Sequence, residues 1–126
     1  MIKKSVIDIN SGLGGRAYAF LKAGYKIEVL FEKDKENCNI LKSVFGDVQI
    51  LEDELTNIDV SQLPDTGVIS AKYIFSRSTH SKYTRYNGGI AKRKEIDDNE
   101  FIFKAVKQKR PNVFILEVPP TIISIK

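Results

Sequence analysis

Residues 8–15, Asp-Ile-Asn-Ser-Gly-Leu-Gly-Gly, have the residue types and spacing best suited to binding a ligand. They follow an apolar run at residues 5–7 and precede a helix-like segment at residues 16–24. A glycine-rich turn between a strand and a helix is the nucleotide-binding corner of a doubly wound α/β sheet. Gly12 and Gly14 let the backbone approach a ligand, and the helix amino terminus favours a carboxylate or phosphate there. The same pattern occurs in ordinary strand-to-helix turns, so both interpretations stay open.

A second candidate is a basic segment, residues 72–94, which has seven lysines and arginines and no acidic residue. Tyrosine and phenylalanine are interleaved with the charges, a composition that suits contact with a phosphate backbone. A solvated loop explains the composition equally well. We predict a loop at residues 76–94, with residues 87–89 as its most flexible point. The expected DNA contacts are Arg77, Lys82, Arg85, Lys92, Arg93 and Lys94.

Length and composition predict one domain of a globular protein, with 126 residues, 42% hydrophobic residues and a net charge of +4. No apolar run approaches the roughly 20 residues that cross a bilayer, and residues 1–4 are not followed by a signal-peptide core, so we expect no membrane partner. A lone cysteine fits a reducing compartment, so we expect a cytoplasmic location. Cys38 is the single cysteine, which excludes an internal disulfide. With one histidine besides, the sequence predicts no metal site.

The segments that contain these motifs are predicted to alternate between strand and helix along the chain. Alternation of this kind predicts a parallel sheet in a three-layer, Rossmann-like α/β fold, with strand order 3-2-1-4-5 and right-handed crossovers. Asp34 can cap the second helix, and a turn-rich connection follows at residues 55–63. The predicted strands are residues 6–10, 25–32, 48–51, 67–71 and 113–118, and the predicted helices include residues 16–24, 35–45 and 101–106.

Together these segments resemble the amino-terminal part of DNA (cytosine-5) methyltransferases, over roughly residues 5–120. Residues 8–15 are similar to the family's Asp-Leu-Phe-Ser-Gly-x-Gly-Gly cofactor motif, and residues 31–34, Phe-Glu-Lys-Asp, to its second motif. Residues 52–54 resemble the Gly-Asp-Ile motif, and residues 110–118 resemble the Lys-Pro-x-x-x-x-x-Glu-Asn-Val segment. The resemblance implies an S-adenosylmethionine-dependent methyltransferase fold, truncated after the fifth strand and forming a single domain over residues 1–126.

The resemblance also implies a binding site for S-adenosylmethionine. The glycine turn and the start of the first helix would receive the methionine carboxylate. Glu32 would bind the ribose hydroxyls, as an acidic residue after the second strand does in such folds. Asp53 would contact the adenine amino group; both carboxylates could instead be simple surface groups. The expected cofactor residues are Asn10, Ser11, Gly12, Gly14, Glu32, Lys33 and Asp53.

The sequence departs from the family where the family's chemistry takes place. In the family a Pro-Cys-Gln-x-Phe-Ser motif follows the fourth strand, and its cysteine adds to cytosine. Here residues 71–76 read Ala-Lys-Tyr-Ile-Phe-Ser, with Lys72 at the position of the nucleophile. Cys38 cannot substitute, because we predict it as a small hydrophobe on the buried face of the second helix. We therefore expect no catalytic residue of this kind.

Two further departures weaken the ligand sites. Glu117 matches the glutamate that holds the cytosine ring, but Val118 and Pro119 replace the family's Asn-Val. Asn10 replaces the aromatic residue that packs on the adenine. These changes predict a catalytically degenerate homologue that retains S-adenosylmethionine binding and weak, non-specific DNA binding. The alternatives are one subunit of a split methyltransferase of a restriction-modification system, or a non-catalytic regulatory or scaffold protein. Because a sheet ending at the fifth strand leaves apolar side chains uncovered, we expect a homodimer or a complementing methyltransferase chain.

Overall fold

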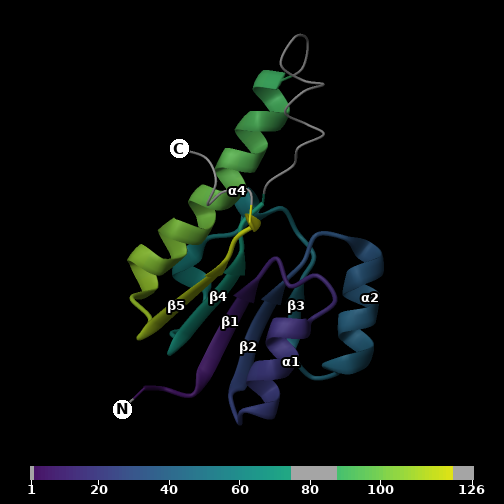
Figure 1. The fold of residues 1–126 in the computed structure, drawn as a ribbon, viewed down its shortest axis with the longest axis vertical. Helices are drawn as coiled ribbons and strands as arrows, with labels where there is room; N and C mark the ends of the chain where they lie inside the picture. Colours follow the sequence, from purple (N-terminus) through teal and green to yellow (C-terminus); the bar gives the residue numbers. More distant parts are fainter. Residues whose placement is uncertain (1, 75–87, 121–126) are drawn as a thin grey trace.

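A five-stranded parallel sheet forms the centre of the computed structural model, which describes residues 2–74 and 88–120, with the backbone alone at residues 88–97. The spatial order is β3-β2-β1-β4-β5, and every neighbouring pair is parallel. The predicted fold class and strand order are therefore confirmed (Figure 1). The strands are β1 (Ser5–Ile9), β2 (Lys26–Phe31), β3 (Gln49–Leu51), β4 (Val68–Lys72) and β5 (Val113–Glu117).

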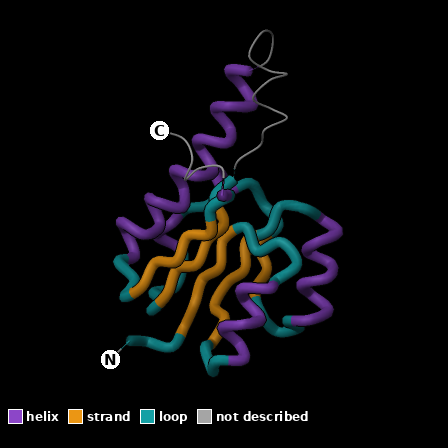
Figure 2. Tube along the Cα trace, viewed as in Figure 1, coloured by secondary structure: helices purple, strands orange, loops and turns teal. Residues whose placement is uncertain are grey.

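Helices cover both faces of the sheet, which gives the three layers (Figure 2). On one face, α1 and α2 pack through Ala17 and Leu41 against a core that includes Leu30 of β2. On the other face, α4 packs through Ile102 and Ala105, beside two short 3₁₀ turns. The bounds are α1 (Gly15–Lys22), α2 (Lys35–Val44), η1 (Leu55–Asn57), η2 (Val60–Gln62) and α4 (Gly88–Lys109).

The start of α2 follows from its sequence. The Asp34 side chain accepts a hydrogen bond from the Asn37 amide, the N-cap arrangement that satisfies one of the helix's free donors. Cys38 and Leu41 lie on the buried face of α2, as their spacing predicts. Ile40 and Val44 are apolar residues at the same three- and four-residue spacing, but they lie exposed. In α1, likewise, only Ala17 is fully buried, and Leu21 is 45% exposed. Leu13, in the turn before the helix, is 64% exposed. Apolar spacing therefore overestimated the buried width of both helices.

The predicted loop over residues 76–94 is wrong in its second part. Helix α4 begins at Gly88, so Gly89 and the basic residues at 92–94 belong to a helix. The prediction relied on glycine and on charge, but lysine, arginine and glutamate are good helix formers, and two glycines cost only about 1 kcal/mol each in a helix. The contacts that residues 98–109 make with the sheet stabilise a helix that continues outward from them (Figure 1). The other expected DNA-binding residues, at 77, 82 and 85, lie outside the described residues.

Strand β5 is the last strand of the sheet within the described part of the chain. Phe114 and Leu116 pack toward α4, and the Phe114 ring meets Phe103 edge-on at 6.2 Å. Ile115 faces the other side and is 42% exposed. One face of β5 is therefore covered within the chain, whereas on the other face Ile115 is left exposed between Val113, which packs against the core, and Glu117.

Candidate functional site

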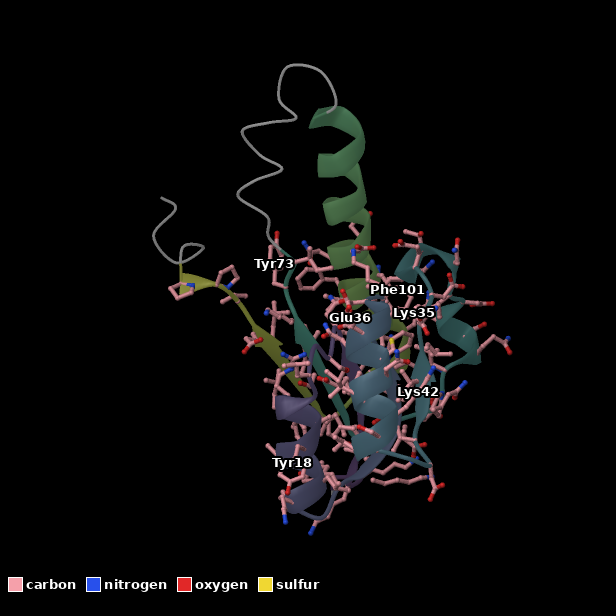
Figure 3. All side chains as sticks on the ribbon, turned by 90° about the vertical axis from the view of Figure 1, so that its right-hand side faces the viewer. Tyr18, Lys35, Glu36, Lys42, Tyr73 and Phe101 are labelled. Carbon is pink, nitrogen blue, oxygen red and sulfur yellow. The ribbon has the colours of Figure 1, made fainter. Side chains whose placement is uncertain are left out.

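The carboxyl ends of the parallel strands meet at one edge of the sheet, where ligands bind in folds of this type (Figure 1). The glycine turn leaves β1 there, and Glu32 directly follows β2. Lys72 ends β4 and Glu117 ends β5. In Figure 3, Tyr73 and Phe101 lie at the same end of the molecule as Lys35 and Glu36 at the start of α2. The topology thus gathers most of the expected site residues at one edge.

The glycine turn is fixed by hydrogen bonds to both neighbouring strands. The Ser11 amide donates to the Phe31 carbonyl at 2.9 Å, and the Asn10 side chain donates to the Lys72 carbonyl at 2.9 Å. Asn10 has a φ of +60°, a left-handed conformation that asparagine tolerates better than an aromatic residue does. The asparagine that replaces the family's aromatic residue therefore has a structural role in this turn.

Gly14 precedes α1, with a φ of +91°. A Cβ atom here would lie 2.8 Å from the side chains of Leu41 in α2 and of Phe45, the residue that follows the helix. The glycine therefore permits the turn to pack directly on α2, and the amino terminus of α1 stays at the sheet edge.

Glu32 connects the glycine turn to the start of α2. One carboxylate oxygen accepts a hydrogen bond from the Gly12 amide at 2.8 Å, and the other accepts from the Asp34 amide at 2.9 Å. Glu32 is partly buried. The oxygen bound by the Asp34 amide also receives a longer bond, 3.5 Å, from the Asn37 side chain, whereas the oxygen bound by the Gly12 amide can accept a second bond. The arrangement fixes an acceptor-only group beside the glycine turn, where it can bind a pair of hydroxyls.

The other two charged residues expected to bind cofactor have different neighbours. Asp53 accepts hydrogen bonds from the Glu54 amide at 2.8 Å and from the Asn57 side chain at 3.2 Å, so it shapes the turn at η1. Lys33 extends to α4, where its ammonium lies 3.3 Å from the Asp98 carboxylate. The structure therefore places Lys33 between the turn after β2 and helix α4.

Arg16 is the site residue that the sequence analysis missed. Its guanidinium lies 3.1 Å from the buried Asp8 carboxylate and 2.8 Å from Glu117, and it donates to the Asn10 carbonyl at 2.8 Å. Burial raises the pKa of the Asp8 carboxyl, and the nearby Arg16 guanidinium partly counteracts this rise. Arg16 thus links β1, the glycine turn and β5. Its position after the turn was the available signal, but its partner in β5 lies 101 residues away.

Of the residues considered for the reacting centre, Lys72 and Glu117 lie in strands and Cys38 lies in a helix. Lys72 pairs in register with Glu117, so it lies within β4 rather than in the loop that follows. The Glu117 side chain, about half exposed, is paired with Arg16. Cys38 is buried in α2, where its thiol donates to the Glu32 carbonyl and burial raises its pKa, as its predicted place in the core requires. The Glu117 and Cys38 side chains are thus engaged within the protein, and Lys72 presents an exposed amine at the end of β4.

The chain after β4 is fixed by a residue of α4. The Ile74 amide donates to the Asn99 side-chain oxygen at 2.9 Å, and the Asn99 amide group donates back to the Ile74 carbonyl at 2.9 Å. This reciprocal pair sets where the segment after β4 leaves the sheet.

Among the residues described with side chains, no three histidine, cysteine or acidic groups are placed to hold a metal ion. No described helix is long and apolar enough to cross a membrane.

Solved structures that resemble this chain in fold include methyltransferases. A protein described as a DNA modification methyltransferase, encoded within an E. coli prophage, superposes with a TM-score of 0.72 and 16% identity, over 94% of this chain and 33% of that one. The glycopeptide N-methyltransferase MtfA, solved with S-adenosyl-L-homocysteine, gives a TM-score of 0.58 and 11% identity, over 92% and 46% of the two chains. The fold is therefore that of S-adenosylmethionine-dependent methyltransferases.

Sequence comparison identifies the family. The model of the C-5 cytosine-specific DNA methylases matches residues 4–124, so the chain belongs to that family. The Type II methyltransferase M.PspPI of Psychrobacter sp. (strain TA137) is 34% identical over 59 residues, which are 47% of this chain and 14% of that protein. The chain thus spans a small part of the length of this curated relative.

The link between Arg16 and Asp8 predicts a pH-dependent loss of stability. Arg16→Met should lower the free energy of unfolding by about 3 kcal/mol at pH 7, because it leaves a buried carboxylate unpaired. Without the guanidinium, the pKa of Asp8 should rise further above 3.8. A raised folded-state pKa gives stability that is present below the unfolded value and is lost as pH rises through the folded value. Urea unfolding from pH 4 to 8 measures the unfolding free energy of both proteins. The deficit of Arg16→Met relative to the wild type should grow as the pH rises.

The matched control is Glu117→Gln, which removes the exposed partner of the same guanidinium. It should change the unfolding free energy by less than about 1 kcal/mol. A destabilisation by Arg16→Met that is the same at every pH would contradict the assigned cause.

Proposed function

We propose that this chain is a catalytically degenerate cytosine-5 DNA methyltransferase homologue that binds S-adenosylmethionine. The observation that carries the proposal is the hydrogen bond between Glu32 and the Gly12 amide. It places a carboxylate next to a glycine turn at the amino terminus of a helix, in a chain of this family. The helix terminus and the turn favour the methionine carboxylate, and Glu32 has acceptor capacity left for the ribose hydroxyls.

The absence of a thiol after β4 supports the degenerate state. The only cysteine of the 126-residue sequence is Cys38, which lies in the core. Lys72, at the position matched to the nucleophile, provides no thiolate to add to a pyrimidine. Glu117 is in turn paired with Arg16, which leaves the base-holding carboxylate engaged within the protein. Both features oppose methyl transfer by this chain alone.

Weak DNA binding forms the second part of the proposal. The outer part of α4, with residues 92–94, extends beyond the edge of the sheet at which the strands end (Figure 1). Lys92, Arg93 and Lys94 place three positive charges there. Such a basic segment would bind phosphates without reading sequence.

The split-enzyme alternative is supported by a different observation. β5 is the last strand of the sheet within the described residues, and Ile115 on one of its faces is exposed, so a complementing chain or a second copy of this one could pack here. A subunit of this kind would keep cofactor binding and gain catalysis only with its partner. The scaffold alternative predicts no cofactor binding, so a titration separates it from the other two.

Titration calorimetry with S-adenosylhomocysteine tests the cofactor site. The wild type should bind, and Glu32→Gln should weaken binding by about tenfold to a hundredfold, because an amide presents a donor where two backbone amides need an acceptor. Asp47→Asn, which removes an exposed carboxylate after α2, is the control and should bind as the wild type does. Wild-type protein that does not bind the nucleoside would support the scaffold alternative instead.

Methyl transfer is tested by incubating the pure chain with DNA and methyl-labelled S-adenosylmethionine. No label should enter cytosine, and Lys72→Cys should not restore turnover, because residue 72 lies within a strand. Contaminating activity is controlled by a parallel preparation of Glu32→Gln. Time-dependent labelling by the wild type that is lost in this variant would refute the degenerate state.

The salt dependence of DNA binding tests the basic helix. Replacing Lys92, Arg93 and Lys94 by alanine should weaken binding and reduce the slope of log K against log salt by about 2–3, since each neutralised phosphate contributes about 0.9. The control replaces Lys4, Lys22 and Lys26, which lie toward the opposite edge of the sheet and give the same change in net charge. Equal slopes for the two triple variants would show that only net charge matters.

A further inference from the structure

A buried carboxylate in α4 has an unused acceptor. Asp98 is 1% exposed, and one of its oxygens lies 3.3 Å from the Lys33 ammonium. The other oxygen, Oδ1, is buried and has no hydrogen-bond partner among the residues described with side chains. A buried acceptor without a donor is costly and uncommon in native proteins, so this atom points to a partner that is not part of the described chain.

Contacts on both sides place Asp98 at the edge of the candidate site. Lys33, which holds one of its oxygens, directly follows Glu32. The next residue of α4, Asn99, holds Ile74 after β4. One turn further on, Phe101 packs edge-on against Phe31, with 5.8 Å between the ring centroids. Asp98 therefore lies between the turns that follow β2 and β4, on the Glu32 side of the glycine turn.

The chemistry of this position specifies its partner. A carboxylate oxygen accepts hydrogen bonds, so Oδ1 requires an N–H or O–H donor. Lys33 balances the negative charge, so the donor can be a neutral group. The other carboxylate considered for the nucleobase, Asp53, already receives two donors from its own turn on one oxygen. Among the described residues, Asp98 is the buried carboxylate near Glu32 with an acceptor free.

We propose that Asp98 Oδ1 accepts a hydrogen bond from the exocyclic amino group of adenine, and that Lys33 is the positioning residue that orients the carboxylate. The inference rests on the proposed function, because the adenine belongs to the bound S-adenosyl nucleoside. It assigns the selection of an amino-bearing purine to α4. A purine with a carbonyl at the same position should bind more weakly, because its oxygen and Asp98 Oδ1 are both acceptors and cannot form a hydrogen bond with each other.

The test compares two ligands, S-adenosylhomocysteine and its deaminated analogue S-inosylhomocysteine, by titration calorimetry. The wild type should prefer the adenosyl compound by at least about tenfold. Asp98→Asn should reverse this preference: Lys33 retains the amide oxygen, and the amide nitrogen then donates to the inosine carbonyl. Asp98→Ser has a side chain too short to reach both Lys33 and the ligand. In this variant the two ligands should bind with nearly equal affinity. Asp53→Asn is the matched control and should keep the wild-type preference.

The outcomes separate this inference from the proposed function. Wild-type protein that binds neither ligand would overturn both. Binding with a preference that survives in folded Asp98→Asn or Asp98→Ser would overturn the role of Asp98 alone. Loss of the preference for the adenosyl compound in Asp53→Asn would also overturn the role of Asp98, because that result assigns the contact with the amino group to Asp53. Thermal unfolding of each variant establishes that it is folded, and if Asp98→Asn does not fold, Asp98→Ser and Asp53→Asn decide the question.

Discussion

The buried charge of Asp8 is the constraint on which the site edge depends. A carboxylate inside a parallel sheet is unfavourable unless a cation and hydrogen bonds accompany it. Arg16 supplies both, and it can do so only if α1 begins immediately after the glycine turn. The same guanidinium contacts the Asn10 carbonyl and Glu117. One ion pair thus determines where the turn, the first helix and the end of β5 lie relative to one another.

A second set of contacts, independent of Arg16, joins the other side of the edge to α4. Asn99 holds the chain after β4, and Asp98 meets Lys33 after β2. Glu32 lies between the two sets, with one oxygen on the glycine turn and the other on the start of α2. Most of the polar groups at this edge therefore stabilise the fold, and ligand binding depends on the acceptor capacity that remains.

The features predicted correctly from the sequence depend on local pattern. Alternating strands and helices determine the strand order, and Asp34 and Cys38 occupy the cap and core positions that their spacing indicates. The partners of Arg16 and Asp98 could not be predicted, because both pairs join segments that meet only after the sheet has formed. The start of α4 was missed for the opposite reason: two glycines and a run of charge suggested a loop, but the packed inner half of the helix outweighs that local preference.

The geometry of α4 has a mechanical consequence. Its inner half is packed against the sheet, and residues 88–97 continue past Asp98 for about 15 Å at the rise of an α-helix. A rod supported at one end amplifies small rotations at its support: a tilt of about 10° at Asp98 moves the far end by roughly 3 Å. The two side chains at the support, Asp98 and Asn99, both contact the turns at the sheet edge. The direction in which the charged outer half extends therefore depends on a few polar contacts at that edge as well as on the packed inner half of the helix.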